Sequence, residues 1–217
     1  MPVLNEAAVI RRRLDELARL GLGETIVVDG GSTDGTQALV VGARLLVSAP
    51  GRATQMNAGA AVATGEVLLF LHADVSLPDD ARVHLEQALA DPQVVAGAFR
   101  TWTIADRPSR LGPLLHLADV RSRYSSLPYG DQALFVRSTV FHQLGGFPPL
   151  PLMEDLAFSQ RLSKAGRIRI VRASVRVSGR RFIEHPVRST VMVNLFPALF
   201  RLGVSPAVLA QLYGAVR

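Results

Sequence analysis

Residues 67–78 read VLLFLHADVSLP, and this stretch decides the fold class. The apolar run 67–71 has the length and composition of a buried strand, and a helical pattern follows over 79–89. His72 and Asp74 stand between the two. In sheets built from alternating strands and helices, ligands bind at the carboxyl ends of the strands. The stretch therefore predicts a strand that brings an imidazole and a carboxylate to a cleft, unless the two residues only form a turn or cap the next helix.

The alternation of strand and helix continues through the first half of the chain. It predicts an α/β fold with a mainly parallel sheet flanked by helices. Asn5 is the expected N-cap of the first helix, and Asp79 or Asp80 that of the third. The chain opens at MPVLNE, so a strand before the first helix is very short at most. The predicted strands are 25–28, 45–47, 67–71 and 94–99, and the predicted helices are 6–20, 52–63 and 79–89.

The pattern loosens after residue 103. Residues 106–124 combine helical and loop character, and 130–137 is a predicted strand that enters a helix at Ser138. Gly166 suits the end of a helix over 154–165. Two further helices, over 187–202 and 206–213, are expected to close the chain.

The composition limits the partners and the chemistry. The chain has 217 residues, of which 48% are hydrophobic, and this is enough for one sizeable core. The formal net charge of +6 comes almost entirely from arginine, with Lys164 the only lysine. Such a balance fits a nucleotide, a phosphorylated substrate or an anionic membrane, and we expect no nucleic-acid partner. The absence of cysteine excludes disulfides and thiolate metal sites.

Two segments of the sequence bear on the location of the protein. The opening MPVLNEAAVIRRR has no apolar core, so we expect no signal peptide. The segment 187–204 is apolar but contains two arginines, an asparagine and a proline, so we expect no membrane span. A cytoplasmic location follows as the expectation.

Two stretches carry groups that suit a phosphorylated ligand. Asp29 opens the glycine-rich loop DGGSTDGT after a buried strand, where it can accept from a base N–H or a ribose hydroxyl, or simply shape the loop. The loop contains no GxGxxG pattern. Arg52 lies at a helix N-terminus, where a guanidinium and free N–H groups favour a diphosphate, although a lone arginine is more often just exposed.

Other residues are candidates for metal binding and proton transfer. Asp74 can ligate Mg²⁺ or Mn²⁺, and His72 shares its side of an extended chain. His185 is a candidate third ligand from the far end of the chain. Glu154 and Asp155 begin a helix, where a carboxylate acts as a general base or only favours the helix dipole. Candidate acceptor contacts are Asp131, Gln132 and Arg181.

Taken in order, the motifs PVLNE, VVDGGSTDGT, GRATQMNAGAAVATGEVLLFLHAD and GGFPPLPLMEDLAFSQRLSKAG resemble one family. The chain is similar to inverting family 2 glycosyltransferases with the GT-A fold, over about residues 2–169. The His-Ala-Asp form and the SGRRF…H segment look like a small bacterial subgroup whose acceptor is unassigned. The resemblance implies a single domain with a nucleotide-binding half (1–105), an acceptor and catalytic half (106–186) and a helical tail (187–217).

The resemblance also implies roles for individual residues. Asp74 matches the last acid of an Asp-x-Asp motif that holds a divalent metal, Mn²⁺ or Mg²⁺, on the donor diphosphate. Asp155 matches the base that acts on the acceptor hydroxyl, beside Glu154. Arg181 faintly matches an arginine near the acceptor. The positions that match the nucleotide-binding motifs are Pro2, Leu4, Asn5, Glu6, Asp29, Gly30, Ser32, Arg52, Ala73 and Asp74.

The sequence departs from the family pattern at two positions. Gly30 stands where a second loop acid is usual, and His72 replaces the first acid of Asp-x-Asp. We expect transfer of a sugar from a nucleoside diphosphate to an acceptor hydroxyl or phosphate, with a lipid-linked molecule as one option for the acceptor. The alternatives are a sugar-phosphate nucleotidyltransferase, which would need a glycine-rich loop that MPVLNEAAVIRRR lacks, and a degenerate nucleotide-binding or scaffold protein.

The apolar tail has two readings as well. Residues 187–202 can lie on a membrane surface, at the inner face of the cell membrane, or pack as a core or dimer helix. From the sequence we expect packing or a homodimer ahead of membrane contact.

Overall fold

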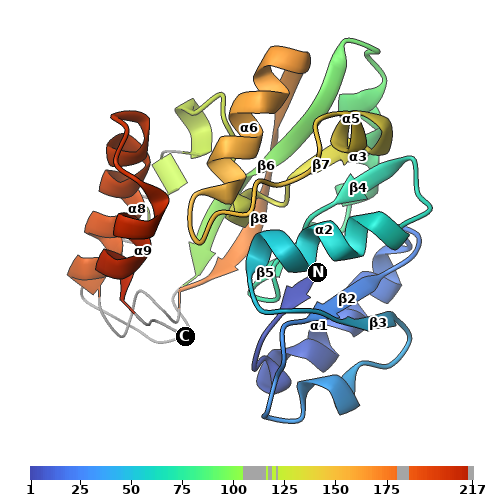
Figure 1. Ribbon diagram of the computed structural model, residues 1–217. Helices are drawn as coiled ribbons and strands as arrows, with labels where there is room; N and C mark the ends of the chain where they lie inside the picture. The colour runs from blue at the N-terminus through green and yellow to red at the C-terminus, as the bar shows by residue number, and fades with distance from the viewer. Residues whose placement is uncertain (105–115, 117–118, 121, 180–185, 215–217) are drawn as a thin grey trace.

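The computed structural model (Figure 1) describes residues 1–104, 116, 119–120, 122–179 and 186–214. The account that follows concerns these residues. They form two sheets, the helices packed on them, and a helical hairpin at the C-terminal end. In Figure 1 the N-terminal elements fill the lower part of the molecule, and the hairpin stands to one side.

The first sheet is parallel throughout, as the sequence predicts. It contains β1 (Pro2–Val3), β2 (Ile26–Asp29) and β3 (Arg44–Val47), in the order β1-β2-β3. Successive residues of β2 point to opposite faces. Val27 packs with helix α1 (Ala7–Leu20) on one face, and Val28 lies against Gly59 of helix α2 (Arg52–Val62) on the other.

The second sheet is mixed, and here the expectation of a mainly parallel sheet is wrong. Its order is β4-β7-β6-β8-β5, and only β6 and β8 run parallel. Strand β7 lies between β4 and β6 and is antiparallel to both. Strands β5 and β8 are absent from the sequence prediction. The strands are β4 (Val67–Leu69), β5 (Val75–Ser76), β6 (Val94–Ile104), β7 (Phe135–Arg137) and β8 (Arg167–Ser178).

The helices agree closely with the sequence prediction. The structure also contains two short 3₁₀ helices, η1 (Thr36–Leu39) and η2 (Gly130–Gln132). A strand was predicted over 130–137, and η2 replaces the first part of it. The predicted helix within 106–124 lies mostly outside the described residues. The helices are α1 (Ala7–Leu20), α2 (Arg52–Val62), α3 (Ala81–Leu89), α5 (Ser138–Gln143), α6 (Glu154–Ala165), α8 (Pro186–Arg201) and α9 (Pro206–Tyr213).

An aromatic cluster holds α2, α5 and α6 to the second sheet. Phe70 contacts Phe141 and Phe147 with ring centroids 5.1 and 4.8 Å apart, and Phe158 lies 4.7 Å from Phe147. All four rings are buried. Burial of a phenylalanine contributes about 1.5–3 kcal/mol, so the cluster fixes α6 firmly against the sheet.

The start of α1 is capped by another part of the chain. Asn5, the predicted N-cap, has a φ of 54°, and its Oδ1 accepts from the backbone N–H of Thr33 at 2.9 Å. The residue at the N-cap position is Glu6, whose side chain makes no capping bond. The backbone N–H groups of Glu6 and Ala7 donate to Thr36 Oγ1 and Asp34 Oδ2 instead. The local prediction is therefore wrong, because the loop after β2 supplies the cap.

A cavity of about 250 Å³ lies beside the short strand β1, between the first sheet, α2 and β4. Met1 lines the cavity, and its terminal ammonium donates to Ile26 O at 2.7 Å. Burial lowers the pKa of this ammonium from 8.0 to about 5. The amine is therefore uncharged at neutral pH.

Within the described part of the chain, no helix is both long enough and apolar enough to cross a bilayer.

Candidate active site

The loop after β2 is organised around the carboxylate of Asp29. Asp29 is fully buried, and its Oδ1 accepts from the backbone N–H groups of Gly31 and Ser32 and from Gln37 Nε2, each at 2.8 Å. Ser32 Oγ donates to Oδ2. Burial by itself would raise the pKa of Asp29, but these hydrogen bonds lower it below its usual value. Asp29 thus shapes the loop, as one of the two sequence readings expects.

The first residues of the chain lie along this loop. Gly30 N donates to Val3 O at 3.0 Å, and Asn5 N donates to Ser32 Oγ at 2.8 Å. Pro2 and Glu6 are buried and Leu4 is partly exposed. The structure therefore brings the predicted nucleotide-binding residues of both segments together.

Gln55 explains why a glycine stands at position 30. A Cβ at Gly30 would lie 3.1 Å from the side-chain amide of Gln55. That amide is fixed, because its Nε2 donates to Val3 O and Val28 O, both at 2.8 Å. A second acid at this position would need Gln55 to move, so the amide occupies the space of the usual carboxylate.

Arg52 begins α2 and forms an ion pair with the first residue of α6. Its Nε lies 2.7 Å from Glu154 Oε1, and its Nη2 lies 3.2 Å from Oε2. Glu154 is 1% exposed. Burial alone would lower the pKa of Arg52, but the carboxylates of Glu154 and Asp155 raise it above its usual value. The ion pair thus holds the guanidinium of Arg52 against the first turn of α6.

Ala73 and Asp74 form a turn between β4 and β5, and not an extended strand end. Strand β4 stops at Leu69, and Val75 N donates to His72 O at 3.1 Å. His72 and Asp74 therefore do not share a face through strand geometry, as the sequence reasoning assumed. Asp74 is partly exposed, and its backbone oxygen accepts from Ser178 N at 2.9 Å.

His72 meets the first turn of α6 at Gly130. A Cβ at Gly130 would lie 3.0 Å from His72 Nε2 and 3.2 Å from Asp155 Oδ2. Gly130 N donates to Asp155 Oδ2 at 2.6 Å. Asp155 is partly exposed, unlike Glu154 beside it. The imidazole and the partly exposed carboxylate thus approach the same point of the backbone, where a Cβ would lie in tight contact with both.

The predicted acceptor residues differ in their burial and in whether the structure describes them. Gln132 is buried, donates to Phe99 O at 2.9 Å and accepts from Tyr129 N at 2.9 Å, so its amide supports the fold. Asp131 is partly exposed beside Gly130. Arg181 and His185 lie outside the described residues.

Arg13 is a site residue that the sequence reasoning missed. It is 7% exposed, and its Nε donates to Ala73 O at 3.1 Å while its Nη1 bonds to Glu16 and Ser76. It thereby holds both sides of Asp74 from helix α1. Helical spacing could have identified it, because it follows the buried Ile10 by three residues and so lies on the core face.

Positive φ values of non-glycine residues border the site. Asn5, Ala133 and Met153 have φ values of 54°, 49° and 65°. Each lies within two residues of a candidate residue, namely Glu6, Gln132 and Glu154. Such strained positions persist where surrounding contacts enforce them, and they are concentrated at functional sites.

A divalent metal fits this site only with help from a ligand. Within the residues the structure describes, no three His, Asp or Glu side chains are grouped to hold a metal ion. Mg²⁺ is commonly held by one or two carboxylates together with substrate phosphates. The exposed carboxylate of Asp74 meets that requirement if phosphate oxygens complete the shell.

Comparisons with known proteins identify the family and the fold. Residues 1–147 match the sequence profile described as "Glycosyl transferase family 2". The chain is 43% identical over 88 residues to a "PGL/p-HBAD biosynthesis glycosyltransferase" of Mycobacterium bovis, in a match that covers 36% of this chain and 34% of that protein. The chain thus spans about a third of the length of the curated relatives it matches.

Two solved structures share the fold. A mannosyltransferase from Pyrobaculum calidifontis, in complex with GDP-Man and Mn²⁺, has a TM-score of 0.72 at 23% identity, covering 99% of this chain and 68% of that one. Glucosyl-3-phosphoglycerate synthase from Mycobacterium tuberculosis, in complex with Mn²⁺, UDP and phosphoglyceric acid, has a TM-score of 0.57 at 22% identity, covering 80% and 66%.

Proposed function

This chain belongs to glycosyl transferase family 2, and on that premise we propose that it moves a sugar from a nucleoside-diphosphate sugar to an acceptor hydroxyl or phosphate with inversion. The observation that carries the proposal is the meeting of three segments at the first turn of α6. Arg52 arrives from α2, His72 from the turn after β4, and Gly130 from η2. The fold is GT-A, and the partly exposed Asp155 stands where these segments converge.

The donor nucleoside is assigned to the loop after β2. The segment 2–6 and the loop 29–32 form one hydrogen-bonded wall, shaped by Asp29. The diphosphate is assigned to the N-terminus of α2, where the first N–H groups have no side-chain cap and Arg52 adds a cation. Ion pairing to Glu154 holds that guanidinium in one orientation.

The reaction needs one proton acceptor and a stabilised leaving group. The acceptor oxygen attacks the anomeric carbon from the side opposite the diphosphate, a new C–O bond forms, and the bond to the diphosphate breaks. Asp155 takes the proton of the acceptor hydroxyl. Arg52 and the α2 N–H groups stabilise the negative charge that the departing nucleoside diphosphate gains. Glu154 orients Arg52.

Asp74 is the residue assigned to a divalent metal, Mn²⁺ or Mg²⁺. When bound, the metal neutralises charge on the diphosphate. Arg13 donates to the backbone oxygen of Ala73 and to the hydroxyl of Ser76, on either side of Asp74. His72 is either a further ligand or, by its place at Gly130, a neighbour of the base, and His185 stays a candidate ligand from outside the described residues.

The similar structures narrow the choice of donor only through the ligands that their descriptions name. The two structures above were obtained with GDP-Man and with UDP. GDP and UDP are therefore the first nucleotides to test. The acceptor is unidentified, with Asp131 as a candidate contact, and a lipid-linked molecule stays an option. The expected location is the cytoplasm, and the tail either reaches the inner membrane face or pairs with a second copy.

The donor half of the proposal is tested by thermal unfolding with UDP, GDP, ADP and dTDP, each with Mn²⁺, Mg²⁺ or EDTA. A nucleotide at about 100 times its Kd stabilises a protein by ~2.7 kcal/mol. We expect one nucleotide to raise the melting temperature with metal, and Asp74→Ala to abolish the metal-dependent part. No shift with any nucleotide would favour a scaffold, and pyrophosphate release from a nucleoside triphosphate and a sugar phosphate would favour a nucleotidyltransferase.

The catalytic half is tested by Asp155→Asn. An asparagine oxygen can still accept from Gly130 N but cannot take up a proton at neutral pH. We expect the variant to unfold cooperatively and to bind the donor nucleotide like the parent chain. Transfer, or donor hydrolysis if no acceptor is known, should fall by about 100-fold or more. Retained turnover in the variant would remove Asp155 from the role of base.

A further inference from the structure

Helix α8 has an apolar stripe on its outer side. Val191, Leu195 and Leu202 are 50%, 46% and 82% exposed. Val191 and Leu195 stand four residues apart on one side of α8, and Leu202 follows in the turn after the helix ends at Arg201.

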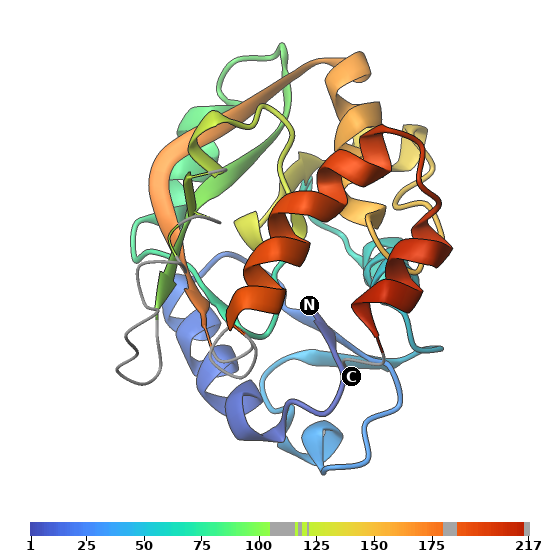
Figure 2. The ribbon, with the colours of Figure 1, turned by 90° about the vertical axis from the view of Figure 1, so that its left-hand side faces the viewer.

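Helix α9 continues this apolar surface. Val208 and Leu212 are 46% and 56% exposed and stand four residues apart. The opposite side of the hairpin is buried, because Phe196 of α8 and Leu209 of α9 pack with Leu152. Figure 2 shows the two helices as the outermost layer on this side of the molecule. The hairpin thus has one apolar side against the protein and another that faces outward.

The charges of the hairpin have a single sign. Residues 186–214 contain no aspartate or glutamate, and their charged residues are Arg188 and Arg201, of which Arg201 donates to Tyr129 Oη at 3.4 Å. The whole chain carries +6. A second copy on this surface would bring like charges together, whereas an anionic surface would attract them.

We infer that the outer side of the α8–α9 hairpin binds the surface of an anionic lipid bilayer, with the helices lying in the interface. Helix α8 has 16 residues and contains Pro197, and it does not meet the requirements of a membrane span. Apolar side chains with flanking arginines and no acids are the features of an interfacial helix. From the sequence, a homodimer was expected ahead of membrane contact. These charges favour membrane contact instead.

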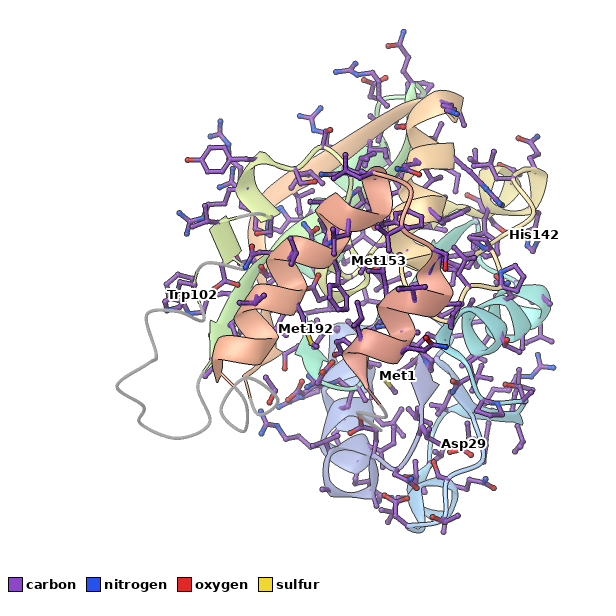
Figure 3. All side chains as sticks on the ribbon, turned by 60° about the vertical axis from the view of Figure 1, so that its left-hand side comes forward. Met1, Asp29, Trp102, His142, Met153 and Met192 are labelled. Atoms are coloured by element: carbon purple, nitrogen blue, oxygen red, sulfur yellow. The ribbon has the colours of Figure 1, made fainter. Side chains whose placement is uncertain are left out.

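The inner side of the hairpin joins the membrane contact to the candidate site. Met153 immediately precedes Glu154, and it packs with the hairpin together with Met192, as Figure 3 shows. Tyr213 of α9 lies near enough to Arg52 to raise its pKa. A bilayer on the outer side therefore lies close to the first turn of α6. If the proposed transfer is right, its acceptor is an amphipathic molecule at the bilayer surface; the membrane contact does not depend on that transfer.

Co-sedimentation with lipid vesicles tests the inference. The full chain is mixed with vesicles of phosphatidylcholine alone, or with an equimolar amount of phosphatidylglycerol. We expect binding to the anionic vesicles that weakens as salt is raised, and weaker binding to the neutral ones. Leu195→Gln/Leu212→Gln should lower the partition coefficient about tenfold. The matched control is Val41→Gln/Val83→Gln, whose side chains are 57% and 49% exposed elsewhere, and it should bind like the parent chain.

Three outcomes would overturn the inference. The first is no binding to anionic vesicles by a folded chain, and the second is an equal loss in both double variants. The third is a concentration-dependent dimer in sedimentation velocity that Leu195→Gln/Leu212→Gln dissociates, without vesicle binding by the parent. None of these outcomes bears on nucleotide binding, which the thermal measurements test separately.

Discussion

At the scale of single residues, Gly130 holds the two most chemically active side chains of the site at a fixed separation. Its N–H donates to Asp155, and His72 lies against the position of its absent Cβ. The imidazole and the carboxylate thus depend on a residue that has no chemistry of its own. Placement errors of about 1 Å cost roughly 100-fold in rate for well-oriented groups.

Gly130→Ala is therefore expected to impair transfer more than folding. A methyl group 3.0 Å from His72 and 3.2 Å from Asp155 displaces both by a few tenths of an ångström. We expect kcat to fall about tenfold, with nucleotide affinity unchanged. The comparison variant is Gly59→Ala, whose new methyl would lie 3.1 Å from Val28, away from the reacting groups. Equal kcat losses in the two variants would contradict this role of Gly130.

At the scale of elements, α1 and the loop after β2 satisfy each other's backbone. Thr36 is buried, accepts from Glu6 N and donates to Asp34. Thr36→Val keeps the shape of the side chain and removes the oxygen. We expect the free energy of unfolding to fall by roughly 1–2 kcal/mol, as for a lost N-cap. Thr33→Val, at an exposed position of the same loop, should cost much less, as chemical denaturation of both variants would show.

The elements also show how far the sequence could lead. The helices were predictable because their apolar spacing and their punctuation are local, as α6 with Gly166 illustrates. Strand β8 was not predicted, although the sequence RIRIVRASVRVS alternates with period two. Asp29, Arg52 and Asp155 were identified as candidates from sequence.

Their partners were not predictable in the same way. The ion pair of Arg52 with Glu154 joins residues 102 positions apart, and Arg13 reaches Ala73 across 60. Such pairings follow from how the elements pack, and no local pattern encodes them. The same holds for the cap of α1. The local candidate is Asn5, but the loop after β2 supplies the cap.

At the scale of the whole molecule, stability should rise with pH from about 5 to 8. The Met1 amine has its pKa lowered from 8.0 to about 5 on folding, so between these values the unfolded chain binds a proton that the folded chain does not. Acidification over this range costs the folded state up to roughly 4 kcal/mol. Below it, Asp29, whose pKa is also lowered, loses its contribution as pH falls through its folded pKa.

Urea unfolding at a series of pH values measures this dependence. The control is the same chain acetylated at its N-terminus, which has no amine to titrate. The acetylated chain should show a flatter profile between pH 5 and 8. Identical profiles for the two chains would mean that the amine is solvated in the folded protein.

Helix α1 touches both ends of the proposed donor site. Its first turn is held by the loop that shapes the nucleoside wall, and Arg13, two turns later, holds the backbone around Asp74. A helix transmits displacement along its axis as a stiff rod, so a shift at one end is felt at the other. Nucleoside and metal should accordingly bind with positive cooperativity, each raising the affinity of the other by the same factor.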